Sequence, residues 1–255
     1  WAEQMGFVTN TNQIVMKIYS EALQKFRLAA EGHGDIQPPD TERDRIKTYS
    51  SPLPIWYLPI EEQMVSNDAY PLHALTQRPM HMYHSWGSQN AWLRQITGEN
   101  RLYMAREKGR ELGIETDDWV WVSSHNGRIK VQASLMDGVN KDTVWTWNAI
   151  GKRPGAWNLD KDSSEGTKGF LLNHLISELL PEKGDGYRYS NSDPMTGQAA
   201  WFDLRVKVEK AKPEEQGELE PRFEPTAQPP NMDTPPKVLR YGEAFRSSRG
   251  KGPSS

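Results

Sequence analysis

The residues best suited to chemistry lie in one stretch, from Tyr70 to Leu93, with the sequence YPLHALTQRPMHMYHSWGSQNAWL. An apolar strand is followed directly by hydroxyl, amide, imidazole and guanidinium side chains. The candidate binding residues of this stretch are Thr76, Gln77, Arg78, His84, Ser85, Trp86, Gln89 and Asn90. Such groups bind phosphates and the edges of heterocycles, and consecutive backbone N–H groups after a strand can form an anion-binding nest. The stretch therefore predicts a loop that binds a large polar ligand carrying phosphates.

The same stretch offers two other kinds of chemistry. His73, His81 and His84 lie close enough in sequence to suggest a zinc or iron site, but the stretch has no carboxylate and Pro79 indicates a loop. A serine nucleophile needs a base beside it, and neighbouring side chains such as His84 and Ser85 point in different directions along extended backbone. We therefore expect neither a metal site nor a catalytic triad, and we assign no catalytic residue to this chain.

Tryptophan is abundant, with ten residues, which raises the alternative of a non-catalytic binding barrel for carbohydrate or protein. Four of them form pairs spaced two residues apart, Trp119 with Trp121 and Trp145 with Trp147. Residues two apart on a strand share one face of the sheet. The pairs predict a core or a docking surface rather than an exposed stacking platform.

The composition of the chain excludes several further kinds of partner and site. The net charge of −3 over 255 residues gives no reason to expect nucleic acid as a partner. The chain has no cysteine, so it can form no disulfide, thiolate zinc site or iron–sulfur cluster. It has no apolar run of about 18 residues that could cross a bilayer, and no Walker or GxGxxG pattern. Because it begins with Trp1 and not Met, we expect the start of the gene product to be missing.

Short strands are expected to position the loop. Their predicted ranges are 69–76, 102–104, 119–124, 128–135, 143–147 and 202–209. Short helices are expected at 89–97 and at 105–113, the second ended by Gly113. His125-Asn126-Gly127 predicts a hairpin turn with positive φ at Asn-Gly. This pattern is typical of a mixed, β-rich α/β domain of barrel type.

The segments outside these strands have a different composition. Residues 1–30 are predicted to be helical, and 35–67, with five prolines, to form an extended connector. Loops are predicted at 148–167 and 181–200, separated by a helix at 169–180. Residues 211–255 contain eight prolines and few aliphatic residues, which predicts a disordered tail.

The loop residues also carry a family likeness. The order Thr76-x-Arg78, His84-Ser85 and Asn90-x-Trp92-Leu93 resembles the first loop of the molybdopterin dinucleotide-binding domain. That domain is the C-terminal part of catalytic subunits in the dimethyl-sulfoxide-reductase superfamily. Later segments resemble its helix, hairpin and closing strand, namely Ala105 to Ile129, Asn173-His174-Leu175, Asp193-Pro194 and Val206 to Lys210. The likeness covers residues 68–210.

The resemblance implies a double-psi β-barrel, of the aspartate-decarboxylase-like kind, over residues 68–210. Residues 1–67 would end the preceding domain as a helical and extended segment, and 211–255 would be a Pro-rich charged tail. The implied cofactor is bis(molybdopterin guanine dinucleotide) with molybdenum. Its pterin and phosphates would be held by the loop from Thr76, with a further contact from Asn173. Gln198 stands near the position where relatives have a basic contact, and is expected to take its place.

The resemblance also implies a C-terminal fragment of a molybdenum oxidoreductase catalytic subunit, inactive alone. The metal ligand and a 4Fe-4S cluster would lie in the missing N-terminal part. The loop is most similar to that of subunits that act on small sulfur oxyanions with a membrane anchor and an iron–sulfur subunit, nearest to quinone-linked sulfite dehydrogenases. Polysulfide, thiosulfate and tetrathionate reductases are the alternatives. We expect a cytoplasmic enzyme that is membrane-associated through its partners, with a periplasmic location as the alternative.

Overall fold

The computed structural model describes residues 1, 4–6, 19–53, 58–84, 86–87, 90–148, 150, 169–181, 188–193, 197–199, 204–216, 222–225 and 239–240. The chain divides into two compact units, 1–57 with 194–196, and 58–193 with 197–255. The division between these units lies at 57/58, and the family likeness read from the sequence begins at residue 68. None of the described helices is long and apolar enough to span a membrane.

The extended connector predicted at 35–67 is wrong, because this segment contains two helices. The first unit pairs α1 (Tyr19–Ala30) with α2 (Asp40–Tyr49), and the second begins with α3 (Ile60–Met64). Pro39 and Pro59 directly precede α2 and α3. A proline at the start of a helix loses no helical hydrogen bond, since the first N–H groups have no partner there. These prolines mark helix starts rather than extended chain.

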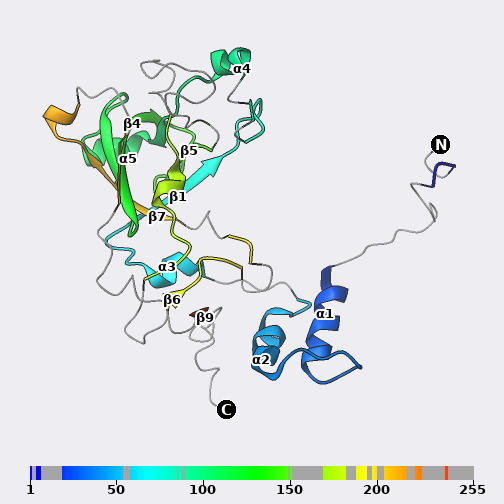
Figure 1. Ribbon diagram of the computed structural model, residues 1–255. Helices are drawn as coiled ribbons and strands as arrows, with labels where there is room; N and C mark the ends of the chain where they lie inside the picture. Colours follow the sequence, from blue (N-terminus) through cyan, green and yellow to red (C-terminus); the bar gives the residue numbers. More distant parts are fainter. Residues whose placement is uncertain are drawn as a thin grey trace. The chain divides into compact units, whose positions relative to one another are not determined.

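The second unit is built on a closed barrel of six strands (Figure 1). Around the ring the strands are β2 (Leu102–Ala105), β5 (Thr143–Trp147), β1 (Leu72–Gln77), β7 (Arg205–Lys210), β3 (Trp119–Ser123) and β4 (Gly127–Met136), and β4 returns to pair with β2. The β1–β5 and β2–β4 pairs are parallel and the others antiparallel. The predicted β-rich barrel is confirmed, with each predicted strand present at nearly its predicted bounds.

The barrel interior is filled by alternate apolar residues. Leu72 and Ala74 of β1 are buried, and so are Val120 and Val122 of β3 and Val144 of β5. Alternation along each strand sends one residue in two to the interior of a closed barrel. The buried side chains of β2, β4 and β7 complete the same core.

Helix α5 (Arg106–Leu112) packs beside β2 and ends as the sequence predicted. Gly113 adopts the left-handed region with φ 65°, and its N–H donates to Arg110 O. The next N–H, of Ile114, donates to Gly109 O at 2.8 Å. These two bonds form a Schellman cap, which needs a residue that tolerates positive φ.

Two local predictions are wrong. The hairpin between β3 and β4 forms, but neither Asn126 nor Gly127 has positive φ; instead the Ser124 side chain accepts from Asn126 N at 3.1 Å and shapes the turn. The helix predicted at 169–180 is a single 3₁₀ turn, η3 (Leu172–Leu175), with extended backbone on both sides. Buried Leu172 and Leu175 pack into the barrel core, and this burial overrides the local helical spacing.

Part of the predicted C-terminal tail is structured. The short turn η4 (Pro213–Glu215) is followed by β8 (Arg222–Pro225), which pairs antiparallel with β4. Gln216 accepts from Trp119 N and donates to Trp119 O, so this segment covers the outer side of β3. Trp119 and Trp121 are buried beneath it, as their spacing predicted. A two-stranded pair of β6 (Arg188–Tyr189) and β9 (Leu239–Arg240) completes the described strands.

Candidate cofactor-binding site

The candidate loop begins where two parallel strands end together. Gln77 is the last residue of β1 and lies opposite Trp147, the last residue of β5. The next residue of that chain, Asn148, donates its N–H to Gln77 O at 3.0 Å. Carboxyl ends of adjacent parallel strands meet at one edge, and the loop after β1 and helix α4 (Ala91–Ile96) lie beyond this edge (Figure 1). The loop is therefore fixed at its base to both strands.

The middle of the loop is anchored by apolar packing. Met82 is buried and clusters with Ile150, Leu93 and Trp147. Gly87 lies so close to Met82 that a Cβ there would come within 3.0 Å of the methionine side chain. A side chain at position 87 would force Met82 to shift by a few tenths of an ångström, so glycine suits the close fold of the loop on Met82.

Asn90 ends the loop as the N-cap of α4. Its Oδ1 accepts from Trp92 N at 2.9 Å and from Leu93 N at 3.4 Å, which satisfies N–H groups that a helix start otherwise leaves unpaired. The predicted short helix at 89–97 is confirmed. Since both bonds use the oxygen of Asn90, a ligand contact from this residue would come from its amide N–H groups.

Arg78 and His84 meet across the loop and make a positively polarised pair. Arg78 Nη2 lies 3.0 Å from His84 Nε2. Because a guanidinium can only donate, Nε2 accepts and the neutral ring carries its proton on Nδ1. No carboxylate forms an ion pair with Arg78 in the described part of the chain, and both side chains are exposed. The pair leaves guanidinium donors available to an anion.

His84 is also strained. Its φ is 47°, in the left-handed region that costs a non-glycine residue on the order of 1–3 kcal/mol. Asp117, shortly before β3, is the other described non-glycine residue with positive φ. Strain of this kind gathers at ligand sites, where the surrounding structure holds it in place. The strain at His84 supports a binding role for the loop.

Behind the loop, a buried asparagine that the sequence did not single out joins distant segments. Asn100 is 4% exposed. Its Nδ2 donates to three carbonyls, Trp147 O at 2.9 Å, Ile150 O at 3.1 Å and Phe170 O at 3.0 Å. Its Oδ1 accepts from Thr146 Oγ1 at 2.7 Å and from Trp147 N at 3.1 Å. Asn100 thus fixes the end of β5, which forms the base of the loop.

Two polar atoms beside this base are buried and have no partner, His81 Nε2 and Asn148 Oδ1. A buried polar atom without a hydrogen bond costs about 1–3 kcal/mol, and native proteins contain few of them. Together with the Arg78–His84 pair, they give the site an anion-binding part and a part that can pair with a polar ring. The residues present therefore fit a ligand that carries both phosphates and a heterocycle.

The remaining predicted residues lie elsewhere or outside the described part. Asn173 is on η3, which Ser124 and Asn126 hold through hydrogen bonds to Leu175 O and His174 O. Its side chain is exposed and makes no hydrogen bond to a described residue. Gln198 is exposed, and its backbone O accepts from Asp193 N at 2.7 Å. Ser85 and Gln89 lie outside the described residues, whereas Thr76 is half-buried in β1 and Trp86 is 71% exposed in the loop.

The three histidines considered for a metal do not form a cluster. His73 lies at the other end of β1, where Arg205 Nη1 is 2.6 Å from its Nε2. Burial, together with the Arg205 charge, lowers the pKa of His73 below its usual value. Arg205 also donates to Tyr70 O and Pro71 O. Among the described residues, no group of three or more potential ligands could hold a metal ion.

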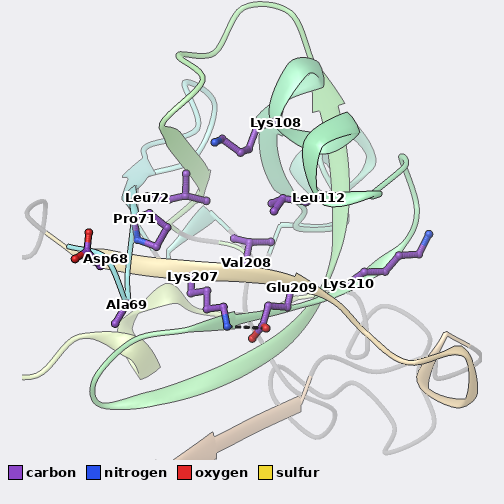
Figure 2. Close-up of a pocket in the computed structure, with 10 residues that line it drawn as sticks. All are labelled: Asp68, Ala69, Pro71, Leu72, Lys108, Leu112, Lys207, Val208, Glu209 and Lys210. Atoms are coloured by element: carbon purple, nitrogen blue, oxygen red, sulfur yellow. Dashed lines mark ion pairs between the residues drawn. The ribbon is translucent and has the colours of Figure 1, made fainter. Parts of the chain in front are cut away.

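A pocket of about 340 Å³ also lies away from the loop, between α5, β7 and the segment before β1 (Figure 2). Lys108, Lys207 and Lys210 line it. Each of these lysines already pairs with a carboxylate, Glu111 at 2.9 Å, Glu209 at 2.7 Å and Asp118 at 2.7 Å respectively. Such pairing leaves little charge for a phosphate, so the loop at the opposite end of β1 is the better site.

A known family matches the barrel part of the chain. Residues 72–189 match the family described as the molydopterin dinucleotide binding domain. By this match, residues 72–189 are a molybdopterin dinucleotide-binding domain. The family match begins with β1 and includes the loop, the Asn100 network and η3.

Relatives of this molybdopterin dinucleotide-binding domain include much longer proteins. A sulfite dehydrogenase subunit from Allochromatium vinosum is 49% identical over 234 residues, which cover 91% of this chain and 24% of that protein. Dopamine dehydroxylase of Eggerthella lenta is 30% identical over 181 residues, covering 69% of this chain and 15% of that protein. Acetylene hydratase from Pelobacter acetylenicus is similar in structure, with a TM-score of 0.48 and 18% identity over 65% of this chain and 22% of that one. The chain spans about a quarter or less of each.

Proposed function

We propose that this chain is the cofactor-holding, C-terminal part of a molybdenum oxidoreductase catalytic subunit that oxidises sulfite. The observation that carries the proposal is the 49% identity to the Allochromatium sulfite dehydrogenase subunit over 91% of the chain. The arrangement at the end of β1 supports it, since an exposed arginine and histidine pair there and no described carboxylate forms an ion pair with the arginine. Reduction of polysulfide, thiosulfate or tetrathionate is the alternative within the same superfamily.

The proposed cofactor is bis(molybdopterin guanine dinucleotide) with molybdenum, which supplies the redox chemistry when bound. The residues of this chain bind and orient it. Arg78 offers its guanidinium fork to phosphate oxygens, and the Nδ1–H of His84 adds a further donor. Thr76, at the end of β1, offers a hydroxyl at the base of the same loop. In the same proposal, Asn173 contacts a heterocycle edge.

The proposal also covers the remainder of the catalytic subunit and its partner subunits. A 4Fe-4S cluster would be held by the N-terminal part of the catalytic subunit, because this chain has no cysteine. A membrane anchor and an iron–sulfur subunit would carry electrons between a quinone and the catalytic subunit, on the cytoplasmic side of the membrane. The word "subunit" in the name of the Allochromatium relative supports an assembly of several chains.

The full-length subunit provides the test. Arg78→Ala and Asn173→Ala should each lower the molybdenum and guanine content of the purified protein, because both remove a contact to the cofactor. Arg106→Ala is the matched control, since Arg106 pairs with Asp137 on the exposed surface of α5. Sulfite-dependent reduction of an artificial electron acceptor by the wild type is expected. Full cofactor content in both variants, or turnover of thiosulfate or polysulfide but not sulfite, would contradict the proposal.

A further inference from the structure

We propose that Phe223 is a positioning residue, whose ring holds η3 and thereby keeps the Asn173 side chain in place for the cofactor. The inference rests on the proposed function, because it takes Asn173 to contact the cofactor. Phe223 lies on β8, outside residues 72–189 of the family match. It acts through His174, the residue next to Asn173, on which its ring stacks. The C-terminal segment of the chain is thereby assigned a part in holding the cofactor.

η3 is a single 3₁₀ turn, and such a turn does not keep its shape alone. It has four residues, Leu172–Leu175, with extended backbone before and after them. One turn fixes the backbone of several residues for few hydrogen bonds, so its conformation depends on contacts with other elements. Asn173 is exposed, and its side chain makes no hydrogen bond to a described residue. The direction of this side chain therefore depends on what holds its neighbours in η3.

The barrel holds η3 by its leucines and by its carbonyl groups. Leu172 and Leu175 are buried in the core. Ser124 Oγ donates to Leu175 O at 2.7 Å, and Asn126 Nδ2 donates to His174 O at 3.2 Å. These two hydrogen bonds act on the backbone, so the ring of His174 has to be fixed by another contact.

Phe223 supplies a contact to that ring. The centroids of the Phe223 and His174 rings are 4.6 Å apart, with an angle of 21° between the ring planes. Phe223 is half-buried and also packs against the barrel core. Stacked rings attract each other beyond the effect of the area that they bury. His174 is therefore held on its backbone by Asn126 and on its ring by Phe223.

β8 can support η3 because β8 is itself fixed to the barrel. It pairs antiparallel with β4, and Phe223 lies opposite Ile129. In the next pair of the same register, Arg128 Nε donates to Glu224 Oε2 at 2.6 Å. Successive side chains of a strand point to opposite faces, so Phe223 and Glu224 contact different parts of the molecule. The ring contact and the ion pair can therefore be removed one at a time.

The inference predicts that loss of the Phe223 ring weakens the hold on the cofactor through Asn173. Phe223→Leu keeps an apolar side chain on β8 but removes the stack, so it should speed release of the cofactor about two- to tenfold, the equivalent of one ring pair. Phe223→Tyr keeps the ring and should release the cofactor at the wild-type rate. In a subunit that already carries Asn173→Ala, Phe223→Leu should change the release rate no further, because the contact through which it acts is absent.

The experiment uses the purified full-length subunit with the cofactor that it acquires in the cell. Bound cofactor is quantified as molybdenum and guanine per subunit, and its release after dilution into cofactor-free buffer is followed by pterin fluorescence. Glu224→Gln is the matched control, because it removes the ion pair between β8 and β4 but no ring. Its release rate should equal that of the wild type.

Three results would overturn the inference. They are wild-type release from Phe223→Leu, release that Phe223→Leu speeds equally with and without Asn173, and release that Glu224→Gln speeds as much as Phe223→Leu does. Each leaves the proposed function intact when the wild type contains molybdenum and guanine, whereas a wild type without them overturns the proposed function itself. Where Phe223→Leu does not accumulate, His174→Ala removes the other ring of the pair and is judged by the same measurements.

Discussion

Replacing Asn100 with alanine should destabilise the chain more than any other single change at a polar residue of the loop base. The Asn100 side chain makes five hydrogen bonds, and their partners are 46 to 70 residues away along the chain. Its loss would free the end of β5 from Phe170 and from Ile150. The base of the loop would then lose its connection to the segment that leads to η3.

The magnitude follows from the donor and acceptor capacity of an asparagine. Nδ2 has two hydrogens, which three carbonyls share, and Oδ1 has two lone pairs, which Trp147 N and Thr146 Oγ1 occupy. Four full hydrogen bonds at about 1 kcal/mol each give a loss of about 4 kcal/mol. This is a large part of the roughly 5–15 kcal/mol that stabilises a typical domain.

Urea unfolding of the 255-residue chain, followed by tryptophan fluorescence, measures the loss. Thr146→Val removes one donor to Asn100 Oδ1 and should cost about 1 kcal/mol, so it calibrates the value per hydrogen bond. Asn140→Ala provides the control for an exposed asparagine, which accepts from Asp142 N in a turn. The reasoning is refuted if Asn100→Ala costs no more than Thr146→Val at an unchanged dependence on urea.

Two further predictions concern β1 and α5. The pKa of His73 is lowered from 6.5 by burial and by Arg205, so the unfolded chain binds more protons as pH falls below 6.5. The free energy of unfolding should therefore fall as pH decreases through that value, and His73→Gln, which does not titrate, should make this fall shallower in pH-dependent urea unfolding. Gly113→Ala places a Cβ at φ 65° and should cost about 1–2 kcal/mol, read as a lower thermal midpoint. Gly138→Ala should have little effect, because a Cβ there meets only Met136 Cε at 3.7 Å; an equal loss in both variants would contradict the argument from φ.

Most strands could be predicted because the alternation of polar and apolar residues along a strand is visible in a short stretch of sequence. β4 and β7 show it clearly, and the Schellman cap at Gly113 was visible as a glycine after a helical segment. The helix at 169–180 was wrong because its leucine spacing fits either a helix or a segment drawn into the core. The carbonyl groups of His174, Leu175 and Ile176 accept hydrogen bonds from the side chains of Ser124 and Asn126, about 50 residues away, instead of from helical N–H groups.

The candidate site was predictable only in part, because some of its contacts join residues that are distant in sequence. Residue types alone indicated a phosphate-binding loop, and the structure brings Arg78 and His84 together within it. Asn100 gave no such signal, since all its partners are distant in sequence. That Asn148 Oδ1 is buried and unpaired could not be predicted either, because no spacing in a sequence reveals it.

The two ends of β1 differ in a way that indicates where a ligand is needed. At its start, Arg205 is satisfied by two carbonyls and His73, so the fold completes its own polar contacts. At its end, His84 is strained, Asn148 Oδ1 is unpaired and Trp86 is 71% exposed. Strain, an unpaired acceptor and an exposed aromatic all carry a free-energy cost that contacts with another molecule can offset. A ligand that satisfies these groups binds the folded chain and not the unfolded one, so its binding must also raise the stability of the barrel.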